Sequence, residues 1–158
     1  KIGGDTSVEI EKEVLRRLGS IELNKPHKIV VVDDDADTLE LIRQVLTYAK
    51  FECVPFAHGG EAQEWLRHNC AAVVVTDLAI DKDLDGLTLI ERIRGHERRN
   101  HKVSSHIIIY TAFDVNEGIR EDAMAFNVEV ILKKGETIPQ DLVEIIKTLL
   151  GQGSIASI

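Results

Sequence analysis

One stretch decides the fold, from residue 28 to residue 35: Lys28-Ile29-Val30-Val31-Val32-Asp33-Asp34-Asp35. Its β-branched residues favour an extended strand, because branched side chains pack well on a pleated surface. The run is apolar without polar alternation, which is typical of a strand that is buried on both faces. The stretch therefore predicts a central strand of a parallel sheet, covered by helices on both sides and ending in three aspartates.

The same pattern recurs along the chain. Strands are predicted over 51–56, 71–77, 106–111 and 128–133, and Pro55 favours an edge position for the first of these. Helices alternate with the strands, first along the apolar face formed by Leu39, Ile42, Val45 and Leu46, then over 59–68, 86–97, 114–126 and 139–150. Five strand–helix units with right-handed crossovers predict a doubly wound α/β domain with a five-stranded parallel sheet.

The two ends differ from this central region. Thr6-Ser7-Val8-Glu9 has the pattern of a capping box and predicts a short N-terminal helix from about Ser7 to Leu18. We expect residues 1–25 to be a helical extension or linker, 26–150 the main domain and 151–158 a flexible tail. Since the chain begins at Lys1 and its only methionine is Met124, we expect that it is processed or cut from something longer.

Composition limits the classes of protein to which the chain can belong. It has 158 residues, of which 44% are hydrophobic, and this is enough for the core of one domain. With 19 Lys and Arg against 27 Asp and Glu, the formal net charge is −8, which argues against direct binding of nucleic acid or of a membrane. No apolar run approaches the ~20 residues of a membrane span. Cys53 and Cys70 are too few for a disulfide framework, and we expect a cytoplasmic location.

Polar side chains gather where the predicted strands end. They are Asp33 and Asp34 after the first strand, Asp77 after the third, Thr111 after the fourth and Lys133 after the fifth. In open α/β sheets the functional crevice lies outside these carboxyl ends. Clustered carboxylates repel one another unless a cation is present, and hard oxygen ligands suit Mg²⁺ or Mn²⁺. With a hydroxyl donor and an ammonium group, they form a set suited to phosphoryl transfer.

Five short motifs follow one another in the sequence: Val31-Val32-Asp33-Asp34-Asp35, Val74-Val75-Thr76-Asp77-Leu78, Asp85-Gly86-Leu87, Ile109-Tyr110-Thr111-Ala112 and Ile131-Leu132-Lys133. In this order they resemble the receiver domain of two-component response regulators. The resemblance covers residues 27–150 and implies a flavodoxin-like strand order, 2-1-3-4-5.

The resemblance implies a role for each matching acid. Asp77 would accept a phosphoryl group from the phosphohistidine of a partner. Mg²⁺ (or Mn²⁺) would bind directly to Asp34, to Asp77 and to the carbonyl of Ala79, and to Asp33 through a water. The chain would not be an enzyme with turnover, because it would catalyse only its own phosphorylation and dephosphorylation.

The resemblance also implies contacts to the phosphoryl group and a set of partners. Lys133, Thr111 and the amide of Ala112 would contact the phosphoryl oxygens, and movement of Thr111 would switch protein–protein interactions. The donor would be a sensor histidine kinase or a histidine phosphotransfer protein. A downstream output domain or protein would respond, and the last helix is a candidate surface for a homodimer.

Several positions depart from the family pattern. The loop from Asp77 to Gly86 is one residue longer than usual, with Asp81 where a proline is common. Lys134 stands where a proline usually follows the strand-five lysine, and Val130 stands where an aromatic switch residue is usual. We therefore expect no rotating aromatic ring to report phosphorylation.

Two further positions bear on the lifetime of a phosphorylated state. Ala79 and Phe113 lie two residues after Asp77 and Thr111, and neither side chain can orient an attacking water. The sequence therefore predicts slow self-dephosphorylation.

Two alternative functions remain at this point. One is a degenerate receiver that acts as a constitutive interaction module, which the departures at Val130 and Lys134 favour. The other is a phosphatase of the haloacid dehalogenase type with Asp33 as nucleophile, because Asp33 and Asp35 have the required spacing. The identity of the modified aspartate, Asp77 or Asp33, distinguishes a receiver from this phosphatase.

Two other patterns are open to more than one interpretation. The stretch 81–86 resembles the start of a calcium-binding loop, but Arg92 occupies the twelfth position, where such a loop requires Glu. A basic cluster closes the helix over 86–97, made of Arg92, Arg94, Arg98, Arg99 and Lys102. We interpret it as a solvated face that complements the helix C-terminus, with a docking patch for an acidic partner as the alternative.

Overall fold

The computed structural model describes residues 8–14, 26–80 and 84–151. Its strands are β1 (Lys28–Val32), β2 (Glu52–Phe56), β3 (Val73–Thr76), β4 (His106–Thr111) and β5 (Val130–Lys133). The helices that alternate with them are α2 (Ala36–Tyr48), α3 (Gly59–His68), α4 (Gly86–Arg99), α5 (Glu117–Ala125) and α6 (Pro139–Leu149). The predicted alternation of strands and helices is confirmed.

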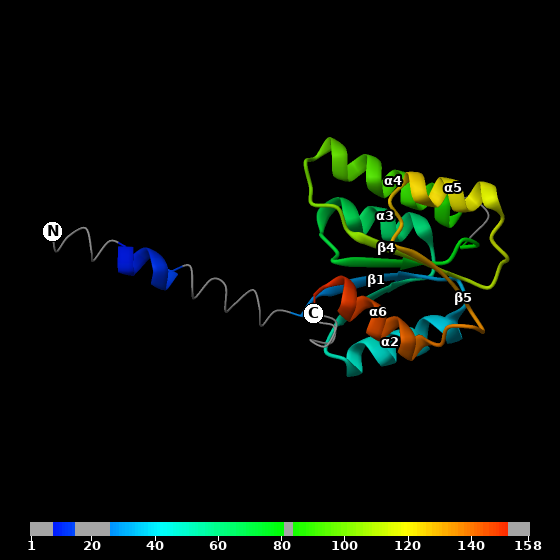
Figure 1. Cartoon of the computed structure of the whole chain (residues 1–158), viewed down its shortest axis with the longest axis horizontal. Helices are drawn as coiled ribbons and strands as arrows, with labels where there is room; N and C mark the ends of the chain where they lie inside the picture. The colour runs from blue at the N-terminus through cyan, green and yellow to red at the C-terminus, as the bar shows by residue number, and fades with distance from the viewer. Residues whose placement is uncertain (1–7, 15–25, 81–83, 152–158) are drawn as a thin grey trace.

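All neighbouring strands pair in parallel, in the order β2-β1-β3-β4-β5 (Figure 1). This confirms the flavodoxin-like order. β1 and β3 are neighbours near the middle of the sheet, with Val32 paired to Thr76. The residues that follow these two strands therefore emerge side by side. β2 lies at one edge, as Pro55 predicted, because an edge strand leaves one side of its backbone outside the ladder.

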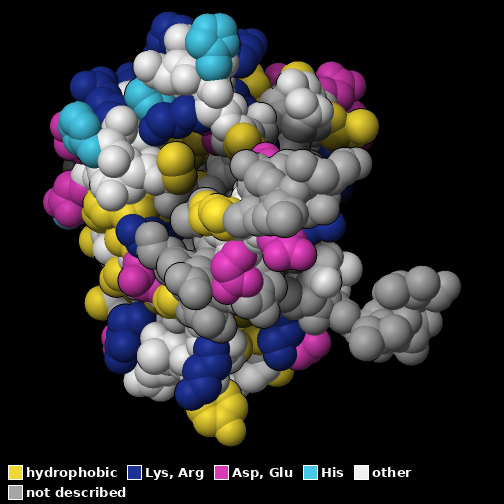
Figure 2. Space-filling view, turned by 90° about the vertical axis from the view of Figure 1, so that its left-hand side faces the viewer, with side chains coloured by type: hydrophobic (Ala, Val, Ile, Leu, Met, Phe, Trp, Pro, Cys, Tyr) yellow, Lys and Arg dark blue, Asp and Glu magenta, His cyan; other side chains and the backbone are white. Residues whose placement is uncertain are grey.

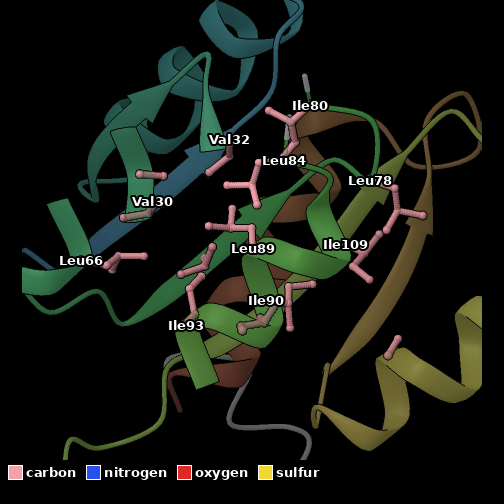
Figure 3. Packing of buried hydrophobic residues seen from close by; sticks show 14 residues of the cluster. Val30, Val32, Leu66, Leu78, Ile80, Leu84, Leu89, Ile90, Ile93 and Ile109 are labelled. Carbon is pink, nitrogen blue, oxygen red and sulfur yellow. The ribbon is translucent and has the colours of Figure 1, made fainter. Parts of the chain in front are cut away.

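Apolar side chains cover both faces of the sheet, because successive residues of a strand point to opposite sides. Val30 and Val32 pack against α3, α4 and α5, and Leu89 of α4 lies among their neighbours (Figure 3). Ile29 and Val31 point to the other face and pack against α2 and α6. Full burial of one such side chain stabilises the fold by about 1.5–3 kcal/mol. The two apolar layers hold the carboxyl ends of the strands in fixed positions.

Short polar side chains determine where three helices begin. Asp35, Asp85 and Asn116 each accept a hydrogen bond from the backbone N–H three residues further on, at 3.3, 2.7 and 2.8 Å respectively. Such a cap stabilises a helix by about 1 kcal/mol, since it satisfies a backbone donor that has no partner within the helix. Because Asn116 is the cap, α5 begins at Glu117 and not at Asp114 as the sequence analysis predicted.

The ends of the chain are described only in part. Residues 8–14 are helical, which confirms the short N-terminal helix over that range. Residues 15–18 of that predicted helix and residues 152–158 of the predicted tail lie outside the described residues. No helix in the described part of the chain combines the length and the apolar character that crossing a membrane requires.

Candidate functional site

Three aspartates meet at the carboxyl edge of the sheet. Asp33 and Asp34 follow β1, and Asp77 follows β3. One carboxylate oxygen from each lies within 4.8 Å of the others, and we call these three residues the acidic cluster. Asp33 and Asp77 are only 2% and 7% exposed, whereas Asp34 is open to solvent. The predicted convergence of these three side chains is therefore present in the structure.

Backbone N–H groups hold one oxygen of each buried carboxylate. Oδ1 of Asp33 accepts a hydrogen bond from the N–H of Asp35 at 2.9 Å. Oδ1 of Asp77 accepts from the N–H groups of Leu78 and Ala79, at 2.7 and 3.3 Å. Because these bonds fix the carboxylates, both Oδ2 atoms are left for other partners. The predicted role of the Ala79 carbonyl as a metal ligand stays a prediction.

Lys134 provides the positive charge at this site. Its Nζ atom donates to Oδ2 of Asp33 at 2.6 Å and to Oδ2 of Asp77 at 2.8 Å, and it lies 5.8 Å from the centre of the Tyr110 ring. Burial acts to lower the pKa of Lys134, but the hydrogen bonds to Asp33 and Asp77 outweigh this effect and raise it above its ordinary value. Lys134 therefore stays protonated between the two acids.

The sequence motifs predicted Lys133 at this position, whereas the structure places Lys134 there. The ammonium of Lys133 forms an ion pair with Asp114, which is exposed and lies outside the acidic cluster. The reason is the twofold alternation of a strand. Ile131 packs on the α3–α4–α5 face, as Lys133 must, whereas Leu132 packs on the α2–α6 face. Lys134 follows Leu132 on the latter side, where it also meets Tyr110.

The pKa of Asp33 reflects the crowding of charges at the cluster. Burial raises it above the ordinary value of 3.8, and the nearby charge of Asp77 acts in the same direction. The hydrogen bonds from Lys134 and from the Asp35 backbone oppose this effect without cancelling it. The single positive charge of Lys134 thus does not fully offset the burial of Asp33 and its repulsion by Asp77. A further cation would bind favourably to the cluster.

Thr111 and Ala112 lie at the end of β4, close to the same edge. The hydroxyl oxygen of Thr111 is buried and accepts a hydrogen bond from the Phe113 N–H at 3.2 Å. Ala112 is exposed in the bend that follows. Neither residue makes a hydrogen bond to the acidic cluster within the ranges that the structure describes. Thr111 instead lines, with Lys133 and Asp114, a separate cavity beside the N-terminus of α5.

Gly86 packs against the backbone of Asp77, the candidate phosphoacceptor. Its N–H donates to the carbonyl of Leu78 at 2.8 Å. A Cβ atom at residue 86 would lie 2.1 Å from the carbonyl oxygen of Asp77, which is far inside contact distance. Only glycine therefore lets α4 start this close to the end of β3. Asp85 of the calcium-loop pattern caps α4, while residues 81–83 lie outside the described residues.

The donor set of the cluster fits a hard divalent cation. Three carboxylates supply oxygen atoms within reach of one ion, and one of the three residues is exposed, so that water can complete the coordination. No sulfur or imidazole ligand belongs to the cluster, so that softer metals are less well matched.

Comparison with known proteins assigns this architecture to a family. A model of the response regulator receiver domain matches residues 29–147. The fold is similar to that of a CheY-like receiver domain protein from Methanospirillum hungatei JF-1, with a TM-score of 0.69 and 23% identity, over 81% of this chain and 97% of that one. It is also similar to a candidate response regulator from Chloroflexus aurantiacus J-10-fl, with a TM-score of 0.67 and 28% identity, over 80% and 99%. The chain belongs to the response regulator receiver domain family.

One curated relative extends the comparison. The phosphoglycerate transport system transcriptional regulatory protein PgtA from Salmonella typhimurium is 31% identical over 72 residues. The match covers 44% of this chain and only 17% of that protein's length. Membership of the receiver family decides against the haloacid-dehalogenase-type alternative, in which Asp33 would be the nucleophile.

Proposed function

We propose that Asp77 accepts a phosphoryl group from a phosphohistidine in a Mg²⁺-dependent reaction, and that its phosphorylation switches protein–protein interactions. The observation that carries this proposal is the setting of the Asp77 carboxylate. Two backbone N–H groups hold Oδ1, while Oδ2 meets Lys134 at the rim of the acidic cluster. A carboxylate held in this way presents one oriented oxygen as a nucleophile.

The transfer would proceed at the Asp77 Oδ2 atom. This oxygen attacks the phosphorus of phosphohistidine, and the N–P bond breaks as the O–P bond forms. The electron pair of the broken bond returns to the imidazole, which takes up a proton from solvent. The product is an acyl phosphate on Asp77. Lys134 neutralises part of the charge on the phosphoryl oxygens, in the role that the sequence analysis gave to Lys133.

Asp33, Asp34 and Asp77 would hold the divalent ion, together with the carbonyl of Ala79. When bound, the ion supplies positive charge against the phosphoryl oxygens. The chain itself holds the three carboxylate oxygens close enough together to bind one ion. The raised pKa of Asp33 is consistent with a cluster that lacks positive charge. Mn²⁺ has similar ligand preferences and should substitute.

Thr111 is the residue that would relay the change. Its oxygen already accepts the Phe113 N–H, so that its own hydroxyl hydrogen is free to be donated to a phosphoryl oxygen. The Ala112 amide would contribute a second donor. Donation by Thr111 would alter the cavity that it shares with Lys133 and Asp114, and so the surface around β5 and α5.

The partners follow from this chemistry. A sensor histidine kinase or a histidine phosphotransfer protein would supply the phosphoryl group. An output domain or a separate protein would bind the surface that phosphorylation changes. One relative is a transcriptional regulatory protein, which supports an output in transcription. A homodimer through α6 remains a proposal of the same kind.

The test is the intact mass of the full chain after incubation with a small acyl phosphate or phosphoramidate, with and without Mg²⁺. We expect a gain of one phosphoryl group that requires Mg²⁺ and that disappears in Asp77→Asn. Asp33→Asn should still be modified, although more slowly. If neither a small donor nor a phosphorylated histidine protein modifies the chain, and titration shows no Mg²⁺ binding, then the chain is a degenerate receiver that acts as an interaction module.

A further inference from the structure

A second site candidate lies at the opposite end of the sheet from the acidic cluster. It is a cavity of about 50 Å³ between the C-terminal ends of α3 and α4, closed by the segment that leads into β4. One water molecule occupies about 10–15 Å³ by this measure, so the cavity has room for about four water-sized groups. This is the size of one tetrahedral oxyanion.

Basic side chains surround this cavity. Its lining includes Arg67 of α3, Arg92, His96 and Arg99 of α4, and Lys102 from the following segment. Figure 2 views this end of the molecule, where Lys, Arg and His side chains gather in the upper part of the face. A chain with a net charge of −8 therefore concentrates positive charge around one cavity, which is partly open to solvent. Such a concentration is costly without a counter-charge.

The acid in the cavity wall already has its own partners. Oε1 of Glu97 accepts from Arg94 at 2.8 Å, and its Oε2 accepts from the N–H and hydroxyl of Ser105 at 2.8 and 2.9 Å. Arg94 also donates to the carbonyls of Phe126 and Ser105, both at 2.8 Å. Arg94 is therefore a largely buried structural residue, with a side chain that is 11% exposed, and is not part of the solvated basic face that the sequence predicted.

Among the other cations of the lining, Arg67 has an ion pair with Glu64 at 3.5 Å, whereas Arg92, Arg99 and Lys102 have no carboxylate partner among the described residues. Arg99 makes no hydrogen bond or ion pair with any residue that the structure describes. Arg92 reaches only the amide oxygen of Gln63, at 3.2 Å, and Lys102 only the carbonyl of Leu66, at 3.1 Å. Three positive charges at the cavity thus lack a carboxylate among the described residues.

His96 adds a neutral donor to this set. The Asn100 side-chain amide donates to the His96 carbonyl at 2.8 Å and lies 3.1 Å from its Nδ1, so that Nδ1 accepts and Nε2 bears the hydrogen. Burial, and next the charges of Lys102 and Arg99, lower the pKa of His96, which keeps the ring neutral. Nε2 is buried and has no partner among the described residues. A buried donor without an acceptor is unfavourable, and an oxyanion would relieve it.

We propose that this cavity binds a tetrahedral oxyanion, either inorganic phosphate or the phosphoryl group of a small phosphate monoester. Arg92, Arg99 and Lys102 provide charge-assisted hydrogen bonds to its oxygens, and His96 provides a further N–H donor. Arginine suits this task because its planar fork matches two oxygens of a phosphate. The site is distinct from the acidic cluster, whose negative charge repels such an anion.

The test is a titration of the full chain with inorganic phosphate, at constant ionic strength and with a chelator present, followed by NMR. We expect saturable shifts of the His96 ring and of the Arg99 and Lys102 amides. Arg99→Gln should weaken binding about tenfold, which is the effect of losing one charge-assisted hydrogen bond. The matched control is Arg98→Gln, which removes the same charge from an exposed neighbour outside the cavity lining and should leave the affinity unchanged.

Further arms of the experiment identify the source of the anion. Tighter binding of glycerol phosphate than of inorganic phosphate would indicate a monoester ligand, and the reverse order a free anion. Asp77→Asn should not alter either titration, because the acidic cluster takes no part. Shifts that grow linearly with concentration, or an equal effect of Arg98→Gln and Arg99→Gln, would overturn the proposal. Lys102→Gln provides an independent second variant, with the same expected loss.

Discussion

The Nζ atom of Lys134 lies 2.8 Å from Oδ2 of Asp77, across the carboxyl edge of the sheet, and 2.6 Å from Oδ2 of Asp33. One ammonium group thereby joins the ends of β1 and β3 to the turn after β5. Its charge offsets part of the repulsion between two buried carboxylates. A divalent ion would bind to the same carboxylates. The lysine and the ion therefore have overlapping roles, and variants of the lysine should have their largest effect on stability when no ion is bound.

We expect Lys134→Met to lower the free energy of unfolding by about 2 kcal/mol when a chelator is present, because two buried carboxylates lose their shared partner. Phosphorylation of Asp77 should also slow by roughly a hundredfold, as for the loss of one donor to a developing charge. Urea unfolding and the time course of mass gain measure the two effects.

Lys133→Met is the matched control for this variant. It removes an exposed ion pair with Asp114, so we expect no measurable change in the free energy of unfolding. If Lys133→Met slows phosphorylation as much as Lys134→Met does, then the effect is not specific to Lys134 and its place at the acidic cluster is contradicted.

The raised pKa of Asp33 predicts a pH-dependent stability. Asp33 binds its proton more tightly in the folded chain than at the ordinary value of 3.8, so its contribution to stability falls as the pH rises from 3.8 through the raised pKa. Asp33→Asn cannot ionise and avoids this loss. We therefore expect the variant to be more stable than the wild type at pH 7 with a chelator present, and the difference to shrink below pH 3.8.

Urea unfolding at the two pH values measures this difference. Asp37→Asn makes the same change of charge on an exposed residue of α2, and it should not reproduce the pH dependence. Equal stability of Asp33→Asn and the wild type at pH 7 would mean that Lys134 fully compensates the burial of Asp33.

The sequence was enough to predict the sheet and the acidic cluster, but not the lysine. β1 and β3 are continuous apolar runs that end in aspartates, so both their burial and the convergence of Asp33 and Asp77 follow from local pattern. β5 is also apolar on both faces. Its pattern therefore gives no preference between Lys133 and Lys134, and the choice depends on which residue of β5 pairs with Thr111.

The basic cavity shows a second limit of sequence reasoning. Arg92, Arg94 and Arg99 look alike as members of one basic helix end. Packing of α4 against its neighbours separates them: Arg94 reaches carbonyls beside β4 and α5, whereas Arg92 and Arg99 line a cavity shared with α3. Helical periodicity describes one helix at a time, and the approach of α3 to α4 depends on tertiary structure.

Gly86→Ala should affect both stability and phosphorylation. The added methyl group would lie 2.1 Å from the carbonyl oxygen of Asp77 and 2.9 Å from the Cα of Leu78, and both are backbone atoms that cannot rotate away. We expect a loss of at least about 2 kcal/mol in unfolding free energy, as for other overpacked sites. Phosphorylation should slow as well, because relief of the clash must displace the end of β3.

Gly60→Ala is the control for this substitution. Gly60 lies in the first turn of α3, and a Cβ there would meet nothing within 4 Å. Alanine should therefore be neutral or stabilising by up to about 1 kcal/mol. Thermal and urea unfolding compare the two variants directly. A Gly86→Ala chain as stable as Gly60→Ala would mean that α4 can begin elsewhere without cost.

The phosphorylated form of Asp77 should be long-lived. Hydrolysis of an acyl phosphate requires a water held in line with the O–P bond. Ala79 follows Asp77 by two residues, and Phe113 follows Thr111 by two residues. Both side chains are exposed, the Phe113 ring to 59%, and neither forms hydrogen bonds with water. Ala79→Asn introduces an amide that can orient a water, and we expect it to speed hydrolysis by roughly tenfold. Intact mass, followed over time after removal of the phosphodonor, measures both rates.

Ala125→Asn, an identical substitution on an exposed turn of α5, should leave the rate unchanged. A lifetime of seconds for the wild-type acyl phosphate would contradict this prediction, because it would require another group to position the water.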